Sequence, residues 1–119
     1  MSSGASKLVI VGDGEFAEIA YEYFTHDSDY DVVAFAVEEE FRQRDELFGL
    51  PVVAFEGLGQ SHPTSEHAVF VAITNTQLNR VRTRLYLAAK EKGYRIATYV
   101  SSRAFVWHNV EIGENSFIF

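Results

Sequence analysis

The sequence predicts an α/β fold, in which a parallel sheet of about five strands is followed by the beginning of a β-helical element. Three observations lead to it. Apolar runs of strand length alternate with helical patterns, a glycine-rich turn follows the first run, and apolar residues recur every six positions from residue 100 onward. The 119 residues have the size of one small domain, and with 47% hydrophobic residues they can form a packed core.

Five apolar runs are typical of parallel strands that are covered on both faces. They occupy residues 7–11, 31–37, 50–55, 68–73 and 94–100. Pro51 suits the start or the edge of the third strand, because proline cannot donate to a sheet ladder. With right-handed crossovers between parallel strands, we expect the sheet order 3-2-1-4-5.

Two helical patterns lie between these strands. The first begins after residue 14 and ends at residues 26–29, and its apolar stripe is expected to contain Phe16, Ile19, Ala20, Tyr23 and Phe24. The second ends at Gly93, and its apolar residues are Leu78, Val81, Leu85, Leu87 and Ala88. Asn75 or Thr76 can cap this second helix. The stretch 56–67 is rich in Gly, Ser and His and predicts a loop with at most a short helix.

The turn after the first strand is the first candidate site. Residues 12–17 read Gly-Asp-Gly-Glu-Phe-Ala, which matches the G-x-G-x-x-A fingerprint of Rossmann-like nucleotide-binding domains. The first glycine permits the tight turn, and the second lets a phosphate approach N–H groups at the helix N-terminus, whereas the aspartate between them would oppose an anion. We expect the substrate-binding residues here to be Gly12, Asp13, Gly14, Glu15 and Phe16. The alternative is a turn that serves packing alone.

Polar residues also follow the second and fourth strands. Glu38 and Glu39 end the second strand, where a carboxylate can accept hydrogen bonds from ribose or sugar hydroxyls. A solvated acidic loop is an equal alternative for this pair. Thr74 and Asn75 follow the fourth strand, although Asn75 can also be only a helix cap. Because the carboxyl ends of parallel strands meet at one edge of the sheet, all four residues are candidates for the same binding site.

Composition argues against several classes of function. The net charge of −7 argues against nucleic acid and anionic membrane as partners, since the basic residues are scattered apart from a cluster in residues 80–95. No run reaches the roughly 18 apolar residues of a membrane span. The chain has no cysteine, which fits a cytoplasmic location, and its histidines, at positions 26, 62, 67 and 108, lack metal-ligand spacing. We therefore expect no metal site. We also find no catalytic motif, and His108 is interpreted as a turn residue.

The spacing of apolar residues changes in the last fifth of the chain. Val100, Val106, Ile112 and Ile118 stand six positions apart. A left-handed β-helix of hexapeptide repeats has this period, because each side of its triangular coil takes about six residues. We expect residues 1–6 to be a flexible lead-in, residues 7–100 to form a Rossmann-like nucleotide-binding domain, and residues 101–119 to begin a β-helix that stops before it is complete.

Together these features resemble the bacterial sugar O- and N-acyltransferases of the sialic-acid O-acetyltransferase and UDP-4-amino-sugar N-acetyltransferase type. The likeness is carried by residues 9–17, 34–39, 50–53, 71–75, 92–94 and 106–115. The resemblance implies a nucleotide sugar held by the Rossmann-like part, and acetyl-CoA held by a β-helix through which the family forms trimers. Two departures stand out, since Glu38-Glu39 replaces the usual Asp-Asp and Thr74 replaces a glycine.

The resemblance implies the function of a UDP-sugar-binding domain. The whole enzyme would be an acetyl-CoA-dependent sugar acyltransferase of bacterial surface polysaccharide or glycan biosynthesis, cytoplasmic and homo-oligomeric. The family's catalytic histidine and acetyl-CoA-binding coils are expected beyond Phe119, so residues 1–119 alone should hold no cofactor and catalyse nothing. Two alternatives stay open: an NAD(P)-binding domain of an oxidoreductase, with Glu38 on the adenosine ribose, and a non-enzymatic nucleotide sensor. The six-residue spacing of apolar residues from residue 100 onward favours neither alternative.

Overall fold

A computed structural model describes residues 7–73, 80–100 and 117–118 of the chain. Its strands are β1 (Lys7–Val11), β2 (Asp31–Val37), β3 (Glu46–Leu47), β4 (Leu50–Ala54), β5 (His67–Val71), β6 (Arg95–Ile96), β7 (Tyr99–Val100) and β8 (Phe117–Ile118). Its helices are α1 (Glu15–His26), α2 (Leu58–Ser61) and α3 (Arg80–Lys92), with 3-10 turns η2 (Glu39–Phe41) and η3 (Phe55–Gly57). No helix within these ranges is long and apolar enough to cross a bilayer.

The main sheet has six strands in the order β3-β4-β2-β1-β5-β6. All neighbours are parallel except β3 and β4, which form an antiparallel hairpin. The expected α/β fold is therefore confirmed, with a sheet that is mostly parallel where a wholly parallel one was expected. The expected number of about five strands is too low, because β3 pairs through two residues, Glu46 and Leu47, that carry no recognisable strand pattern.

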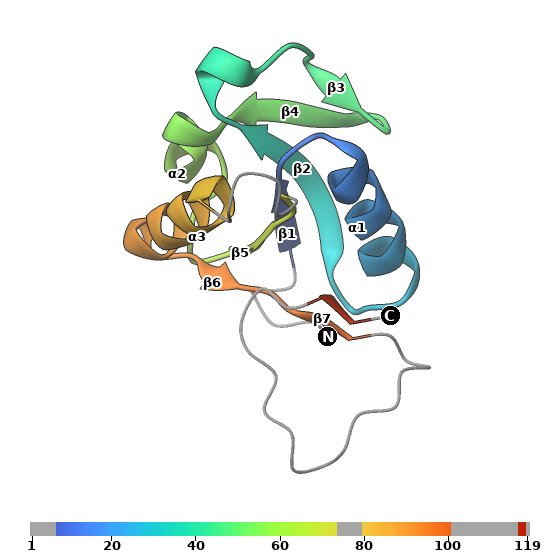
Figure 1. The fold of residues 1–119 in the computed structure, drawn as a ribbon. Coiled ribbons are helices and arrows are strands. Elements are labelled where there is room, and N and C mark those ends of the chain that lie inside the picture. The colour runs from blue at the N-terminus through green and yellow to red at the C-terminus, as the bar shows by residue number, and fades with distance from the viewer. Residues whose placement is uncertain (1–6, 74–79, 101–116, 119) are drawn as a thin grey trace.

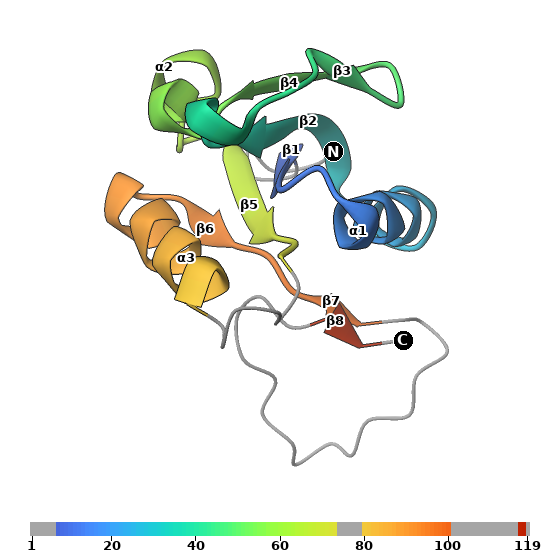
Figure 2. The ribbon, with the colours of Figure 1, turned by 45° about the horizontal axis from the view of Figure 1, so that its top comes forward.

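The sheet is covered on both faces by helices. Figure 1 and Figure 2 show α1 on one face and α2 with α3 on the other. Successive residues of β1 point to opposite faces, so Leu8 and Ile10 belong to the core beneath α1, while Val9 and Val11 belong to the core beneath α2 and α3. All four side chains are buried. This explains the continuous apolar run of the first strand.

The buried face of each long helix differs in part from the expected stripe. In α1 the buried residues are Ala17, Ala20 and Phe24, whereas Ile19 and Tyr23 are 37% and 39% exposed. Likewise, α3 buries Leu85 and Ala89 against the sheet but leaves Leu87 56% exposed. The cause is helical geometry, because each residue is rotated about 100° from the one before it. Ile19 and Tyr23 each precede a buried residue and lie on its flank, whereas Leu87 is two positions from both buried residues of α3 and lies on the opposite face.

The expected last strand, residues 94–100, is divided in two. Its first part, β6, pairs with β5, and the N–H of Ala97 donates to the carbonyl oxygen of Val69 at 2.7 Å. The chain then leaves the sheet, and the buried ring of Tyr99 packs against the ring of Phe24 on α1, with centroids 5.5 Å apart. This packing under α1 takes the second part, β7, away from the sheet.

The two-residue strand β7 pairs in parallel with β8 (Figure 2). Tyr99 lies opposite Phe117, and Val100 lies opposite Ile118. In each pair the two partners lie 18 positions apart in the sequence, because 117 − 99 and 118 − 100 are both 18. The expected coil, residues 101–119, lies outside the described residues apart from this pairing.

Candidate functional site

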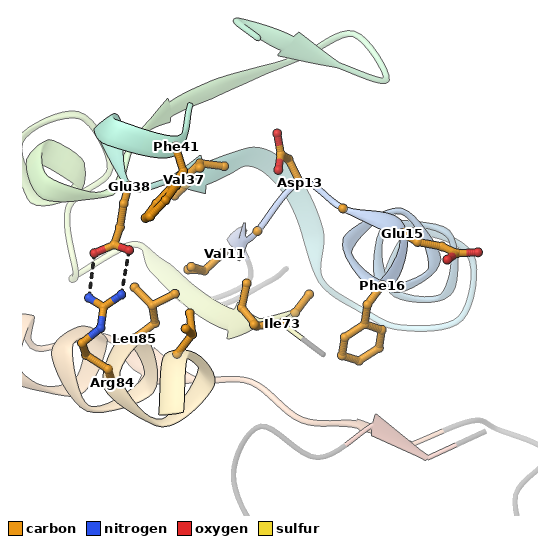
Figure 3. A pocket seen from close by; sticks show the side chains of 15 residues that line it. Val11, Asp13, Glu15, Phe16, Val37, Glu38, Phe41, Ile73, Arg84 and Leu85 are labelled. Carbon is orange, nitrogen blue, oxygen red and sulfur yellow. Dashed lines mark hydrogen bonds and ion pairs between the residues drawn. The ribbon is translucent and has the colours of Figure 1, made fainter. Parts of the chain in front are cut away.

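A cavity of about 550 Å³ opens at the carboxyl ends of β1, β2 and β5 (Figure 3). Its lining consists of Val11, Gly12, Asp13, Gly14, Glu15, Phe16, Ala36, Val37, Glu38, Phe41, Ala72, Ile73, Val81, Arg84 and Leu85. In open parallel sheets, ligands bind at this edge, outside the carboxyl ends of the strands. The volume lies within the range of small-molecule sites, about 300–1,000 Å³.

The first glycine of the β1–α1 turn is required by the fold itself. Gly12 has a φ of +120°, and a Cβ atom there would lie 2.7 Å from the carbonyl oxygen of Ala72. Its N–H donates to the carbonyl oxygen of Ala36 at 2.8 Å, which ties the end of β1 to β2. Gly12 therefore allows the chain to turn between β2 and the segment after β5.

The second glycine, Gly14, is not required by the backbone in this way. Gly14 is the N-cap of α1 with a φ of −88°, which any residue can adopt. A Cβ atom built on it would meet none of the described atoms within 4 Å. The fold therefore does not require glycine here, whereas a bare backbone leaves the first-turn N–H groups of α1 accessible to an anion.

The other three expected residues of the turn, Asp13, Glu15 and Phe16, differ in their surroundings. The carboxylate of Asp13 lies 3.5 Å from Arg44, Oδ2 to Nε, so a basic side chain partly offsets the charge that would repel a phosphate. Glu15 points away from the Glu38 end of the cavity (Figure 3). The ring of Phe16 meets that of Phe70 edge-on, with centroids 5.9 Å apart, so this residue also anchors α1 to the sheet.

At the other end of the cavity, Glu38 is held by an arginine from α3. Arg84 donates from Nη1 to Oε2 at 2.7 Å and from Nη2 to Oε1 at 2.8 Å (Figure 3). The Glu38 side chain is 18% exposed and that of Arg84 is 54% exposed. The hydrogen bonds from Arg84 lower the pKa of the Glu38 carboxyl from its ordinary 4.5, although partial burial acts in the opposite direction. Glu38 is thus held as a carboxylate.

The second member of the acidic pair lies elsewhere. Glu39 is not among the cavity residues, and its carboxylate accepts a hydrogen bond from Nε of Arg42 at 2.9 Å. The structure therefore brings Glu38, but not Glu39, to the cavity. Phe41, two residues farther along η2, lines the cavity with a ring that is 59% exposed.

Thr74 and Asn75, which were expected to bind substrate after the fourth strand, lie outside the described residues, as do the possible cap Thr76 and the turn residue His108. Ile73, immediately before Thr74, lines the cavity. The sequence interpretation did not include Phe41 or Arg84. An aromatic residue just after the acidic run was a usable signal for Phe41, whereas nothing local pointed to Arg84, because its partner lies 46 positions away.

The described histidines lie away from the cavity. His67 is the first residue of β5, and its ring lies 5.0 Å from that of His62, centroid to centroid. This pair is therefore at the amino end of the strand, whereas the cavity is at the carboxyl end. Burial, and to a lesser degree the charge of His67, lowers the pKa of His62 from its ordinary 6.5. Within the described ranges, no three His, Cys, Asp or Glu residues gather in a way that could hold a metal ion.

Sequence comparison finds no matching family model and no matching curated protein. Solved structures do match. The acetyltransferase domain of PglB from Neisseria gonorrhoeae FA1090, in complex with acetyl coenzyme A, matches with a TM-score of 0.77 at 23% identity over 96% of this chain. A mutant of perosamine N-acetyltransferase from Caulobacter crescentus, in complex with CoA and GDP-perosamine, matches with a TM-score of 0.75 at 24% identity over 94% of this chain.

This chain has the fold of these acetyltransferase structures. The resemblance inferred from the sequence is thereby confirmed at the level of the fold. The chain spans about half the length of each, 53% of the PglB domain and 50% of the perosamine enzyme. Both structures contain acetyl-CoA or CoA, which is the cofactor that the resemblance implied for full-length relatives.

Proposed function

We propose that residues 7–100 bind a nucleotide sugar, with UDP as the expected nucleotide, for an acetyl-CoA-dependent sugar acyltransferase of bacterial glycan or surface polysaccharide biosynthesis. The main evidence for this proposal is the cavity at the carboxyl ends of the strands, where ligands bind in such sheets. The cavity has the glycine turn before α1 at one end and the carboxylate of Glu38, held by Arg84, at the other. The fold supports it, since a structure with the same fold is described in complex with GDP-perosamine, a nucleotide sugar.

The two ends of the cavity suggest how the ligand lies. The backbone around Gly14 suits the diphosphate, because helix N-termini attract anions. The carboxylate of Glu38 suits the ribose hydroxyls. The exposed ring of Phe41 and the apolar lining between these ends suit a flat base. In this arrangement the Arg44 side chain, next to Asp13, reduces the repulsion between the turn and the diphosphate.

We assign the described cavity residues to binding. The lining includes carboxylates and one arginine, but among the described residues it contains no histidine, serine, threonine, cysteine or lysine. In an enzyme of this class, acetyl-CoA supplies an activated acyl group that a sugar amine or hydroxyl attacks with the help of a general base. The contribution proposed for these residues is to hold and orient the nucleotide sugar.

The pairing of β7 with β8 supports a β-helical coil over residues 101–119. Parallel partners 18 residues apart are what three hexads, one coil of such a helix, would bring together. We further propose that the protein acts in the cytoplasm as a homo-oligomer assembled through this region. An oxidoreductase domain would have no use for such a coil.

Thermal unfolding of the full chain with UDP, a UDP-sugar, GDP or NAD tests the binding proposal. We expect UDP and UDP-sugars to stabilise the chain, by about 2.7 kcal/mol at a ligand concentration of 100 times Kd, and NAD to have no effect. Stabilisation by GDP instead of UDP would change the nucleotide but keep the class of ligand. Stabilisation by NAD alone would favour the oxidoreductase alternative and refute the proposal.

A further inference from the structure

The pair formed by Glu38 and Arg84 leaves the carboxylate able to accept more hydrogen bonds. Two oxygens of an ionised carboxylate offer about four acceptor positions. Arg84 takes two of them through its two terminal nitrogens. The remaining positions are open to a ligand, since Glu38 lines the cavity and 18% of its side chain is exposed.

The same pair fixes the plane of the carboxylate. A glutamate at the end of a strand has three side-chain torsions and would otherwise turn toward water. The planar guanidinium of Arg84 binds both oxygens at once, and such a two-bond contact sets direction as well as distance. Arg84 is carried by α3, beside Val81 and Leu85, which line the same cavity. The direction of the Glu38 carboxylate is therefore determined from across the cavity.

A fixed acceptor discriminates between ligands more sharply than a mobile one. A ligand that lacks a hydroxyl leaves a fixed carboxylate oxygen without its hydrogen bond, whereas a mobile side chain can turn to water. This step rests on the proposed function, in which Glu38 faces the ribose. We infer that Arg84 is a positioning residue, which fixes the Glu38 carboxylate so that the site distinguishes ribonucleotides from 2′-deoxyribonucleotides.

Calorimetric titration of the full chain with UDP and 2′-deoxy-UDP, and with GDP and 2′-deoxy-GDP, tests this inference. We expect the wild type to bind the ribonucleotide about tenfold more tightly or better, as one lost hydrogen bond to a charged group predicts. Glu38→Ala removes this preference. Arg84→Met reduces it toward the Glu38→Ala value and leaves the affinity for the deoxynucleotide unchanged.

Three further variants make the test specific. Arg84→Lys retains part of the preference, because an ammonium supplies charge but no planar fork. The double variant Glu38→Ala with Arg84→Met behaves as Glu38→Ala, because Arg84 acts through Glu38. The control is Arg95→Met, which removes an exposed arginine on β6 that is not a cavity residue, and it keeps the wild-type preference. Unchanged melting temperatures show that the variants are folded.

The outcomes separate this inference from the proposed function. If Arg84→Met keeps the wild-type preference, or weakens both nucleotides equally, then Arg84 does not act by positioning Glu38, and the inference is wrong while nucleotide binding stands. If the wild type binds neither UDP nor GDP, the proposed function fails and the inference fails with it.

Discussion

A Cβ atom on Gly12 would lie 2.7 Å from the carbonyl oxygen of Ala72, so the turn after β1 and the segment after β5 pack too closely to admit a side chain between them. The N–H of Ala72 in turn donates to the carbonyl oxygen of Val11 at 2.8 Å. The same turn contains Gly14, whose added Cβ would meet none of the described atoms within 4 Å. The two glycines of one motif therefore respond differently to substitution.

Gly12→Ala is expected to destabilise the protein. The substitution forces a side chain into a left-handed backbone conformation and against a backbone oxygen that cannot move aside, at a cost on the order of 1–3 kcal/mol or more. Urea unfolding monitored by circular dichroism measures this change. A free energy of unfolding equal to that of the wild type would mean that the turn can rearrange.

Gly14→Val is expected to abolish nucleotide binding while leaving most of the stability intact. The branched side chain covers the N–H groups of the first turn of α1, and its cost to the fold is about 1 kcal/mol or less, because it replaces only a glycine N-cap. Gly14→Ala, with a single methyl group, serves as the graded control. Unchanged affinity of Gly14→Val in calorimetry would show that the turn is purely structural.

Phe41→Ala is expected to weaken binding of the nucleotide about tenfold or more. Stacking of a base on an aromatic ring contributes about 1–3 kcal/mol, and the Phe41 ring lies at the cavity with 59% of its surface exposed. Titration of the variant with UDP checks this. Phe48→Ala is the control, because it removes an aromatic ring of similar exposure, 46%, that is not a cavity residue. Equal affinities of the two variants would argue against stacking.

Tyr99→Phe is expected to lower the free energy of unfolding by about 1.5–3 kcal/mol, the usual contribution of a hydrogen bond to a charged group. The buried Tyr99 donates its hydroxyl to Oδ2 of Asp27, at the end of α1, over 2.7 Å. A double-mutant cycle with Asp27→Ala measures the coupling between the two residues. Strictly additive effects would mean that this bond does not hold β7 beneath α1.

Stability is expected to decrease as the pH falls below about 6.5, in part because of His62. Burial lowers the pKa of His62 in the folded chain below its ordinary 6.5, so the unfolded chain binds the proton first as the pH falls. Melting temperatures between pH 7.5 and pH 5 should therefore decrease less in His62→Gln than in the wild type. Identical profiles for His62→Gln and the wild type would exclude this contribution.

The sequence predicted the parts of the fold that depend on local pattern. The strand expected at residues 31–37 forms as β2 with those bounds, because its apolar residues have neighbours on both faces. The hairpin that adds β3 has no such pattern. Its turn contains Phe48 at a φ of +55°, and the ring of Phe48 stacks on Tyr21 of α1 at 4.6 Å. This tertiary contact favours a backbone conformation that no local rule would assign to phenylalanine.

The candidate site divides in the same way. The glycine turn could be found because its chemistry is contained in six consecutive residues, and Glu38 because it follows a strand. Arg84 could not be found, because its meeting with Glu38 depends on how α3 packs over the sheet. Nor could the sequence tell whether Glu38 or Glu39 faces the cavity. The two residues are adjacent, but the Glu39 side chain is directed to Arg42 instead.

Both outer edges of the main sheet are made by strands of two residues, β3 and β6. Just before β3, the carbonyl oxygen of Asp45 accepts a hydrogen bond from the N–H of Val52 at 2.9 Å, so one more backbone group of β4 is paired. Exposed edge strands are the places at which a foreign chain can add to a sheet and begin aggregation, and short edges offer it few backbone groups. The described part of the main sheet is thus protected against edge-to-edge aggregation, while the cavity at the carboxyl ends of its strands stays open to solvent.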